Sequence, residues 1–417
     1  MRAASWEELS RIYSDTLADC DPLLHTKRVL AEANIRRRID YKVDIVSIGK
    51  AARPLGLAAV RTFDVGRSFF AGPRGYLRGN DLPPSAHVAL GSHPRLSEAS
   101  FRCGDDLIDF VTAGTCPIVF LLSGGGSATV ERPLEPYFSR KDLLSLDSHI
   151  ALQSLPIAKL NTVRKHLSSI KGGRLGSIAP EGSLAFVLSD VSAGDLHHVA
   201  SGPVLPDPTT NREAAEILRS LDSKETSMAA AHLEDNAVPD TPKALPLDSE
   251  LIADNRTLVE SARRMATRIG FDAVVLETAI EMSVSEAADF LYEAATSLAP
   301  GEVLIAGGEP TVPSIDRSGR GGRCSELLAR FAKLCIENAL APAALFGSSD
   351  GMDGNTSAAA FVLKPKALRS KRASIESIHQ ALAESDSMRL VDALGEAIIT
   401  GPTENNLRDL FLIAAAE

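Results

Sequence analysis

Short glycine-rich segments, most of which also contain charged residues, are spread over most of this chain. There are seven, namely Ser123–Ala128 (SGGGSA), Asn161–Gly173, Ser189–Thr210, Gly307–Val312 (GGEPTV), Gly319–Glu326 (GRGGRCSE), Ser348–Gly354 and Gly401–Thr403. Glycine tolerates positive φ and lets the backbone approach a ligand closely. Lysine, arginine and carboxylates are the residue types that position phosphates and metal ions. The repeated combination indicates one shared site for a phosphorylated substrate.

The segment Ser123–Ala128 follows an apolar run, so its consecutive amides and serine hydroxyls could form a nest for phosphate or carboxylate oxygens. The candidate residues are Ser123, Gly124, Gly125, Gly126 and Ser127. A tight turn between a strand and a helix, with no ligand, explains the same residues about equally well. The segment is not a Walker P-loop, because no Gly-Lys-Ser/Thr follows, and it is not a GxGxxG dinucleotide motif.

Basic residues supply four further candidates. Arg164 and Lys171 lie in the basic stretch 161–174, which ends in a Lys-Gly-Gly-Arg turn, although such a run is more often the solvated face of a helix. Lys50 follows the apolar run Val43–Ile48, and its case depends on its neighbours because a lone lysine there is usually solvated. Arg323 follows two glycines at an expected helix start, where it could bind phosphate with two nitrogens. His166 is as easily explained as a packed residue on a helix face.

Carboxylates follow expected strands in both halves of the chain. Asp190 comes just after the apolar run Leu184–Leu188, where it could hold Mg²⁺ or accept a hydroxyl proton. Glu309 lies in a Gly-Gly-Glu turn, and Asp350 and Asp353 lie in a later glycine loop, so that they could complete a metal site. Asp-Gly pairs are also typical of ordinary turns. Helix capping is an equal alternative for Asp195 and Asp207.

Length and composition limit the class of protein. At 417 residues the chain exceeds the size at which one core usually stops growing, so two domains are expected. A net charge of −10 argues against a general nucleic-acid or membrane-surface binder. Five cysteines without metal-ligand spacing are typical of reduced thiols in a cytoplasm, and no apolar stretch is long enough for a membrane span. We therefore expect a cytoplasmic enzyme with small-molecule partners and no nucleic-acid or membrane partner; a homodimer is left open.

The elements that would position these residues are those of an α/β protein. The apolar runs Val43–Ile48, Pro117–Leu122 and Ser183–Leu188 lack alternation and are separated by helical stretches, which is typical of parallel sheets covered on both faces. Ligands collect beyond the carboxyl ends of such strands, where the glycine-rich segments fall. Residues 218–249 predict a surface helix and a connector between domains. Further helices are expected over 6–35, 261–270, 283–298 and 323–339, and further strands over 273–276, 303–306 and 344–346.

Taken in order, these segments resemble the glycerate 2-kinase family, two-domain proteins whose C-terminal part is called the MOFRL domain. The resemblance runs from about Val43 to Asp409. It is carried by IGKAA (48–52), SHP (92–94), SGGGSA, NTVRKHLSSIKGGRLG, LSDV, ASGPVLPDPTT, GGEPTV, GRGGRCSE, SDGMDG and TGPT. Agreement in many separate blocks is far more specific than agreement in any one of them.

The resemblance implies an ATP-dependent kinase that uses Mg²⁺ or Mn²⁺ and phosphorylates the 2-hydroxyl of D-glycerate. It implies an N-terminal parallel-sheet three-layer sandwich, residues 1–240, and a C-terminal mixed α/β region, residues 241–417, with the MOFRL domain at about 302–412 and the site in the cleft between the two. Lys50 and Arg323 would meet the substrate and the transferred phosphate, and Asp190 would hold metal or act as the base. The substrate- and phosphate-binding residues would be Ser123, Gly124, Gly125, Gly126, Ser127, Arg164, Lys171, Glu309 and Glu326, and the metal ligands Asp190, Asp350 and Asp353.

Several residues depart from the family pattern and could reshape the substrate pocket. They are Arg53, Ser97, Cys324, Ser325, Glu404 and Asn405. Two alternatives therefore stay open beside glycerate 2-kinase. One is a kinase of the same mechanism for another small hydroxy acid or polyol. The other is hydroxypyruvate reductase, a label that members of this family have carried, although the chain has no GxGxxG motif after a strand.

Overall fold

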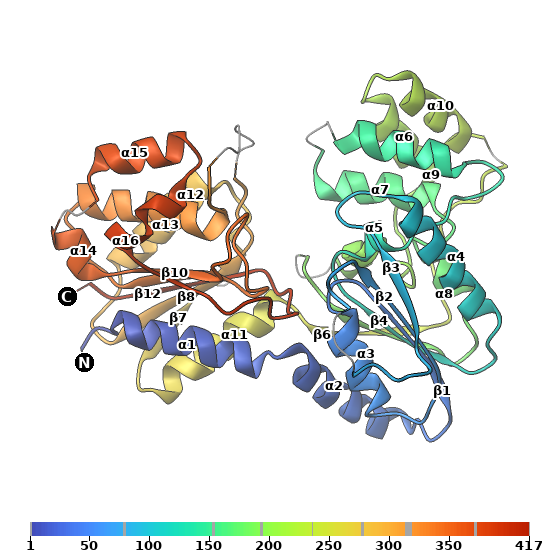
Figure 1. Cartoon of the computed structure of the whole chain (residues 1–417), viewed down its shortest axis with the longest axis horizontal. Coiled ribbons are helices and arrows are strands. Elements are labelled where there is room, and N and C mark those ends of the chain that lie inside the picture. The colour runs from blue at the N-terminus through green and yellow to red at the C-terminus, as the bar shows by residue number, and fades with distance from the viewer. Residues whose placement is uncertain are drawn as a thin grey trace. The chain divides into compact units, whose positions relative to one another are not determined.

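The computed structural model describes residues 2–77, 81–151, 155–191, 195–235, 237–276, 279–312, 319–370 and 373–416. The chain forms two compact units (Figure 1). One consists of residues 22–252, and the other combines residues 1–21 with residues 253–417. Residues 192–194 of the segment Ser189–Thr210 lie outside the described residues.

The unit of residues 22–252 is built on a six-stranded sheet with the order β3-β2-β1-β4-β5-β6. Its strands are β1 (Val43–Ile48), β2 (Val65–Pro73), β3 (His87–Gly91), β4 (Ile118–Leu122), β5 (Leu184–Leu188) and β6 (Asp248–Ala253). Strands β1 to β5 pair in parallel. Every residue of β1, β4 and β5 is buried, because helices and loops cover both faces of the sheet. The expected parallel α/β sheet is confirmed.

Helices of this unit fall into two groups. Those near the sheet include α3 (Ala52–Val60), which packs on β1 and β2, and α4 (Glu98–Thr112), which packs on β3. A second apolar core, which includes Phe138, Val163 and Leu218, joins a group of helices beside the sheet (Figure 1). That group contains α6 (Arg140–Ala151), α7 (Ile157–Leu167), α9 (Asn211–Arg219) and α10 (Lys224–Leu233); the unit also has α2 (Pro22–Arg37), the short α5 (Gly126–Thr129) and α8 (Arg174–Ser177), and the 3-10 helix η1 (Leu196–Ser201).

The second unit contains a mixed six-stranded sheet with the order β11-β10-β9-β12-β8-β7. Strands β7 and β8 are parallel, and the remaining neighbours pair antiparallel. The strands are β7 (Asp272–Val275), β8 (Glu302–Gly308), β9 (Ala344–Ser348), β10 (Ala360–Leu363), β11 (Gly395–Ile398) and β12 (Asp409–Ala414). The expected mixed α/β class of the C-terminal region is therefore confirmed.

Helices cover both faces of this second sheet (Figure 1). On one face lie α1 (Trp6–Asp19), against β9, and α11 (Asn255–Arg268), against β8. On the other face α13 (Arg323–Glu337) packs on β9 and β10. The same layer includes α12 (Val284–Thr296), α14 (Pro365–Ser370), α15 (Ile375–Ala383), η2 (Ser387–Leu390) and α16 (Val391–Leu394). No helix in the described ranges has both the length and the apolar character needed to cross a bilayer.

The first helix of the chain packs within the C-terminal unit. Tyr13 of α1 is fully buried and donates a hydrogen bond to the Ser348 carbonyl oxygen, 2.7 Å away. Asp15 pairs with Arg268 of α11 at 2.9 Å. The compact units thus differ from the expected division at residues 240 and 241, because α1 returns to a sheet formed far along the sequence and the chain passes between units near residue 252. Packing partners so distant cannot be read from the helical pattern of α1 itself.

Candidate functional site

Lys50 and the glycine loop Ser123–Ser127 are joined where β1 and β4 end. The Lys50 amide donates to the Gly124 carbonyl oxygen at 2.8 Å, and the Ala51 amide donates to Ser123 Oγ at 3.0 Å. Gly49 has a φ of +118°, and a Cβ at this position would lie 2.4 Å from the Ser123 oxygens. Two separate sequence motifs therefore form one loop pair at the carboxyl edge of the sheet, where ligands of parallel α/β proteins bind.

The Lys50 side chain lies against this glycine loop together with His93. A Cβ added to Gly125 would lie 2.9 Å from Lys50 Cγ and 3.3 Å from His93 Cδ2. Burial, followed by the charges of Lys50 and Arg164, lowers the pKa of His93 to about 4. The imidazole is therefore neutral at neutral pH, and Lys50 and Arg164 are the cations that act on it. We identified the SHP motif from the sequence but did not select His93 as a site residue.

The glycine loop contains backbone N–H groups that have no hydrogen-bond acceptor in the described part of the chain. Within the described ranges, the adjacent amides of Gly124 and Gly125 donate to no other residue. Gly125 has a φ of +82°, and side chains pack closely around it. Unpaired consecutive amides beside a lysine are what an anion nest requires, so the interpretation of Gly124–Ser127 as a nest stays a prediction that this local geometry supports.

A chain of three polar side chains runs from the loop into the unit. Ser127 Oγ and Ser201 Oγ are 2.8 Å apart, and Ser201 donates to Asn161 Oδ1 at 3.1 Å. Asn161 Nδ2 donates to the His198 carbonyl oxygen at 3.4 Å. Ser201 and Asn161 belong to sequence blocks that we singled out, but neither was selected as a site residue, because their contacts join segments far apart in the chain.

The backbone around Ser201 has left-handed geometry in successive residues. Ala200, Ser201 and Gly202 have φ of 51°, 60° and 59°, and such values are uncommon for residues other than glycine. The turn is held by the amides of Gly172 and Gly173, which donate to the carbonyl oxygens of Ser201 and Gly202 at 3.0 and 2.7 Å. The Lys-Gly-Gly-Arg turn therefore supports the Ser201 loop.

Lys171 forms a buried ion pair within this unit. Its side chain has no exposed surface and forms an ion pair with Glu131, and it also donates to the Val130 carbonyl oxygen at 3.3 Å. Ser168 completes the group by donating to Glu131 Oε1 at 2.5 Å. Because Lys171 is enclosed with its own carboxylate, we reassign it from phosphate binding to support of the loop. Arg164 pairs with Asp147 at 3.3 Å and stays a candidate, since its charge still acts on His93.

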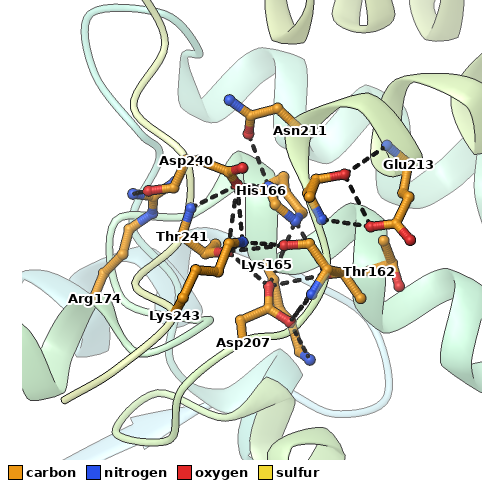
Figure 2. A network of polar contacts seen from close by, with 12 residues as sticks. Thr162, Lys165, His166, Arg174, Asp207, Asn211, Glu213, Asp240, Thr241 and Lys243 are labelled. Carbon is orange, nitrogen blue, oxygen red and sulfur yellow. Dashed lines mark hydrogen bonds and ion pairs between the residues drawn. The ribbon is translucent and has the colours of Figure 1, made fainter.

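A second enclosed network anchors α7, the helix that carries Asn161 and Arg164 (Figure 2). Lys165 Nζ donates to Asp207 Oδ1 at 3.1 Å, and both side chains are fully buried. Burial alone would raise the pKa of Asp207, but Lys165 and the hydrogen bonds from Thr209 bring it below its ordinary value. His166 lies between Thr209 Oγ1 at 3.1 Å and Asn211 Oδ1 at 2.8 Å. The network fixes α7 against the loop that follows Asp207.

In the other unit, Arg323 begins α13 and is oriented by two carboxylates. Its Nε and Nη2 donate to the two oxygens of Asp409 at 3.0 and 3.3 Å, and its Nη1 lies 2.9 Å from Glu309 Oε1. The Arg323 side chain is 36% exposed, whereas Asp409 has no exposed surface. Burial raises the pKa of Asp409 to about 6, although Arg323 opposes that shift. The arrangement fixes the guanidinium while leaving part of it accessible.

Asp409 is a residue that sequence reasoning missed. It is the first residue of β12 and lies opposite Gly308 of β8 and Ser348 of β9. The signal was present, since Asp409 precedes the apolar run Leu410–Ile413. Glu309, which we did select, also lies 3.6 Å from Arg408, so it bridges two arginines.

The expected metal ligands of this unit have other partners. Asp353 is buried and accepts hydrogen bonds from the amides of Cys324 and Ser325 at 2.9 and 3.0 Å, so it caps α13. Asp350 Oδ1 accepts from Ser348 Oγ and the Met352 amide at 2.8 and 2.9 Å. We therefore reassign Asp353 from metal binding to helix capping.

The remaining carboxylates give no metal cage. Glu326 pairs with Arg330 at 2.8 Å on the same helix, which is a structural contact. Asp190 lies directly after β5 and is half-buried. Across the described ranges, no three or more His, Cys, Asp or Glu side chains are grouped so that they could hold a metal ion. These side chains alone do not fit a protein-only Mg²⁺ site.

Two sequence families match this chain. Residues 8–234 match the family described as "Domain of unknown function (DUF4147)", and residues 302–409 match the MOFRL family. The D-glycerate 2-kinase of Thermotoga maritima is 31% identical over 93% of this chain and 92% of its own. An Agrobacterium vitis protein that provisionally carries the name hydroxypyruvate reductase is 30% identical, over 96% and 92%.

The fold leads to the same group of proteins. The crystal structure of glycerate kinase from Thermotoga maritima superposes with a TM-score of 0.87 at 28% identity, covering 98% of this chain and 99% of the other. Similarity therefore extends over both units. The chain belongs to the glycerate 2-kinase family, in which a DUF4147 region is followed by a C-terminal MOFRL domain.

Proposed function

We propose that this protein is an ATP-dependent kinase that transfers a phosphoryl group to the 2-hydroxyl of D-glycerate, giving 2-phospho-D-glycerate and ADP. The observation that carries the proposal is the similarity to a D-glycerate 2-kinase over 93% of the chain. It is supported by Lys50, which lies against the glycine loop, and by Arg323, which carboxylates orient. A bond forms between the 2-oxygen and the γ-phosphorus, the bond from that phosphorus to ADP breaks, and the hydroxyl proton passes to a base, for which Asp190 is the candidate.

Charge neutralisation and positioning are the main demands of such a transfer. Lys50 and Arg323 would be the catalytic cations. The Gly124–Ser127 loop with Arg164 would receive an anionic group, and Glu309 would orient Arg323. Asp190 would accept the hydroxyl proton or bind metal.

Mg²⁺ or Mn²⁺ would supply neutralisation of the nucleotide phosphates when bound. Because the described carboxylates form no cage, the ion would reach the site largely through phosphate oxygens and water, with Asp190 and Asp350 as candidate ligands. Exhaustive chelation should abolish turnover and added Mg²⁺ should restore it. Turnover that continues in the chelated enzyme would contradict this requirement.

The direct test is ADP release with Mg²⁺-ATP and D-glycerate. Lys50→Ala and Arg323→Ala should each lower kcat/KM by roughly 10²–10³, as removal of a charge that stabilises the transition state does. Lys27→Ala on α2 and Lys333→Ala on α13 remove cations outside the site and should keep wild-type turnover. Full activity in either site variant would remove that residue from the proposed mechanism.

Two alternatives are separated by the same assay. The first alternative is a kinase for another acceptor, which is considered because the chain departs from the family pattern at Ser97, Cys324, Ser325, Glu404 and Asn405. The screen should therefore include L-glycerate, glycerol and threonate. The second alternative is a hydroxypyruvate reductase, which is considered because of the name of the Agrobacterium vitis relative. Oxidation of NADH in the presence of hydroxypyruvate would reveal this activity. A cytoplasmic location, a role in carbohydrate metabolism and the absence of nucleic-acid and membrane partners are further parts of the proposal. Sedimentation would show whether a homodimer forms.

A further inference from the structure

We propose that the Ser127 hydroxyl accepts a hydrogen bond from an alcohol group of the acceptor substrate, and does not donate one to an anion. The inference deepens the proposed function, on which it rests for the ligand class, a small hydroxy acid. It follows from the direction of the hydrogen bonds that link Ser127, Ser201 and Asn161.

The direction of this chain is fixed at its inner end. The His198 carbonyl oxygen can only accept, so the Asn161 amide must turn its Nδ2 toward it and its Oδ1 toward Ser201. An amide oxygen also only accepts, so the Ser201 proton is committed to Asn161. The contact of 2.8 Å between the serines then requires Ser127 to be the donor. Ser127 has one proton and has used it, so its oxygen can only accept from a ligand.

The surrounding backbone holds this arrangement firmly. Ser201 has no exposed surface and Asn161 is 3% exposed, so neither exchanges partners with solvent. Ala200 and Ser201 adopt left-handed geometry, which is unfavourable for residues with a Cβ. Such strain in residues other than glycine is typical of functional sites.

Ser127 is placed where a substrate alcohol would meet it. It is half-buried and lies two residues beyond Gly125, against which Lys50 and His93 pack. A hydroxy acid carries its carboxylate and its 2-hydroxyl on adjacent carbons. Loop amides and Lys50 are suited to the carboxylate, and the Ser127 oxygen is suited to the hydroxyl. The side chain of Ser127 is therefore reassigned from phosphate binding to recognition of the alcohol.

Ligand-observed NMR titration of the full chain without nucleotide tests this direction. Lactate and pyruvate differ at C2 by a hydroxyl, which donates, and a carbonyl, which only accepts. A second pair, 3-hydroxypropionate and propionate, reports on a hydroxyl at C3. The wild type should prefer the hydroxylated member of at least one pair by about tenfold or more in Kd.

Two variants should lose that preference in different ways. Ser127→Ala should weaken the hydroxylated ligand about tenfold and leave its partner unchanged. Ser201→Ala frees the Ser127 proton, so for the C2 pair pyruvate should bind more tightly while lactate weakens. A merely structural role for Ser201 would weaken both ligands together. Ser169→Ala, whose hydroxyl donates to the Arg132 carbonyl oxygen at 3.2 Å, is the matched control and should keep both ratios.

The outcomes separate this inference from the proposed function. Unchanged ratios in both variants, or no hydroxyl preference in the wild type, overturn the role of Ser127 even if D-glycerate is phosphorylated. Loss of the preference on Ser127→Ala supports the role even if ADP release shows that another hydroxy acid is the true acceptor. A misfolded variant is recognised by its far-UV circular dichroism, and the other serine variant then decides.

Discussion

Replacing Asp409 by asparagine should make the C-terminal unit less sensitive to pH while impairing catalysis. Asp409 is fully buried at the start of β12 and accepts two hydrogen bonds from Arg323. Burial raises its pKa from 3.8 to about 6. The folded state therefore holds this proton more tightly than the unfolded state does. The resulting stabilisation is fully present below about pH 4 and is lost as the pH rises through about 6.

The size of the effect follows from the shift. A change from 3.8 to about 6 corresponds to about 3 kcal/mol at 1.36 kcal/mol per unit. For a unit of this size, 1 kcal/mol moves Tm by about 2–4 °C, so the loss amounts to roughly 6–12 °C. Because asparagine cannot ionise, the Asp409→Asn variant does not lose this stability as the pH rises. A difference in Tm between the variant and the wild type that is the same at all pH values is also expected, because the asparagine amide places one N–H donor against the Arg323 donors.

Thermal unfolding of the wild type and the variant between pH 4 and 7 measures the effect. The Tm of Asp409→Asn minus that of the wild type should rise by about 6–12 °C across this range. Asp289→Asn, an exposed change on α12 of the same unit that leaves Asp409 in place, is the matched control. At pH 7, kcat/KM should fall 10- to 100-fold in Asp409→Asn because Arg323 loses part of its orientation.

A difference in Tm that stays constant from pH 4 to 7 would refute the reasoning, since Asp409 would then not titrate in this range. A difference that falls with pH would show that the carboxylate stabilises the fold through Arg323. The expected pattern, a residue that costs stability at neutral pH and is needed for activity, is common in active sites.

Two further substitutions test the reassigned residues. Lys171→Met should destabilise the protein by about 3–5 kcal/mol because it leaves Glu131 buried without its cation, whereas Lys171→Met with Glu131→Leu should recover most of the loss in urea unfolding. Asp353→Ala should lower stability by about 1–2 kcal/mol through loss of the α13 cap; a change in the Mg²⁺ concentration needed for half-maximal activity would instead restore Asp353 as a metal ligand.

The sequence was informative about the fold where burial alone decides residue type. Val43–Ile48 is a strand with the expected bounds, and β4 and β5 lie within the expected runs. These strands are covered on both faces, so they must be continuously apolar. Strand β12 was missed although Leu410–Ile413 is apolar, because no loop motif follows it and its partners β8 and β9 are distant in sequence. Strand β2 was missed because Gly66, Arg67 and Ser68 interrupt its pattern.

Prediction of the site succeeded for residue types and failed for their partners. The basic stretch 161–174 was expected to be either solvated or catalytic, yet Lys165 and Lys171 are both fully buried. Each is enclosed with a carboxylate, Asp207 or Glu131, that lies about 40 residues away in the chain. A burial of this kind depends on a tertiary partner, which residue spacing does not reveal. Asp409 was missed for the same reason, since its partner Arg323 lies 86 residues away in the chain.

The same dependence on partners changes how the departures from the family pattern are understood. Cys324 lies in the apolar core, Ser325 donates to Asp353 at 2.7 Å, and Asn405 donates to the Cys20 carbonyl oxygen at 2.8 Å. All three are buried, and each has a partner within the C-terminal unit. Residues in such positions affect stability first, because a lost buried hydrogen bond costs about 1–3 kcal/mol.

Arg53 and Ser97 are equally accounted for within their own unit. Arg53 binds both oxygens of Asp81, at 3.1 and 2.5 Å, and Ser97 caps α4. Glu404 has a left-handed φ of 57°. Most departures are therefore explained by packing and capping, so they give little reason to expect an unusual acceptor. The direction of the Ser127 hydrogen bonds is the stronger guide to the substrate, because it specifies which chemical group the site can accept.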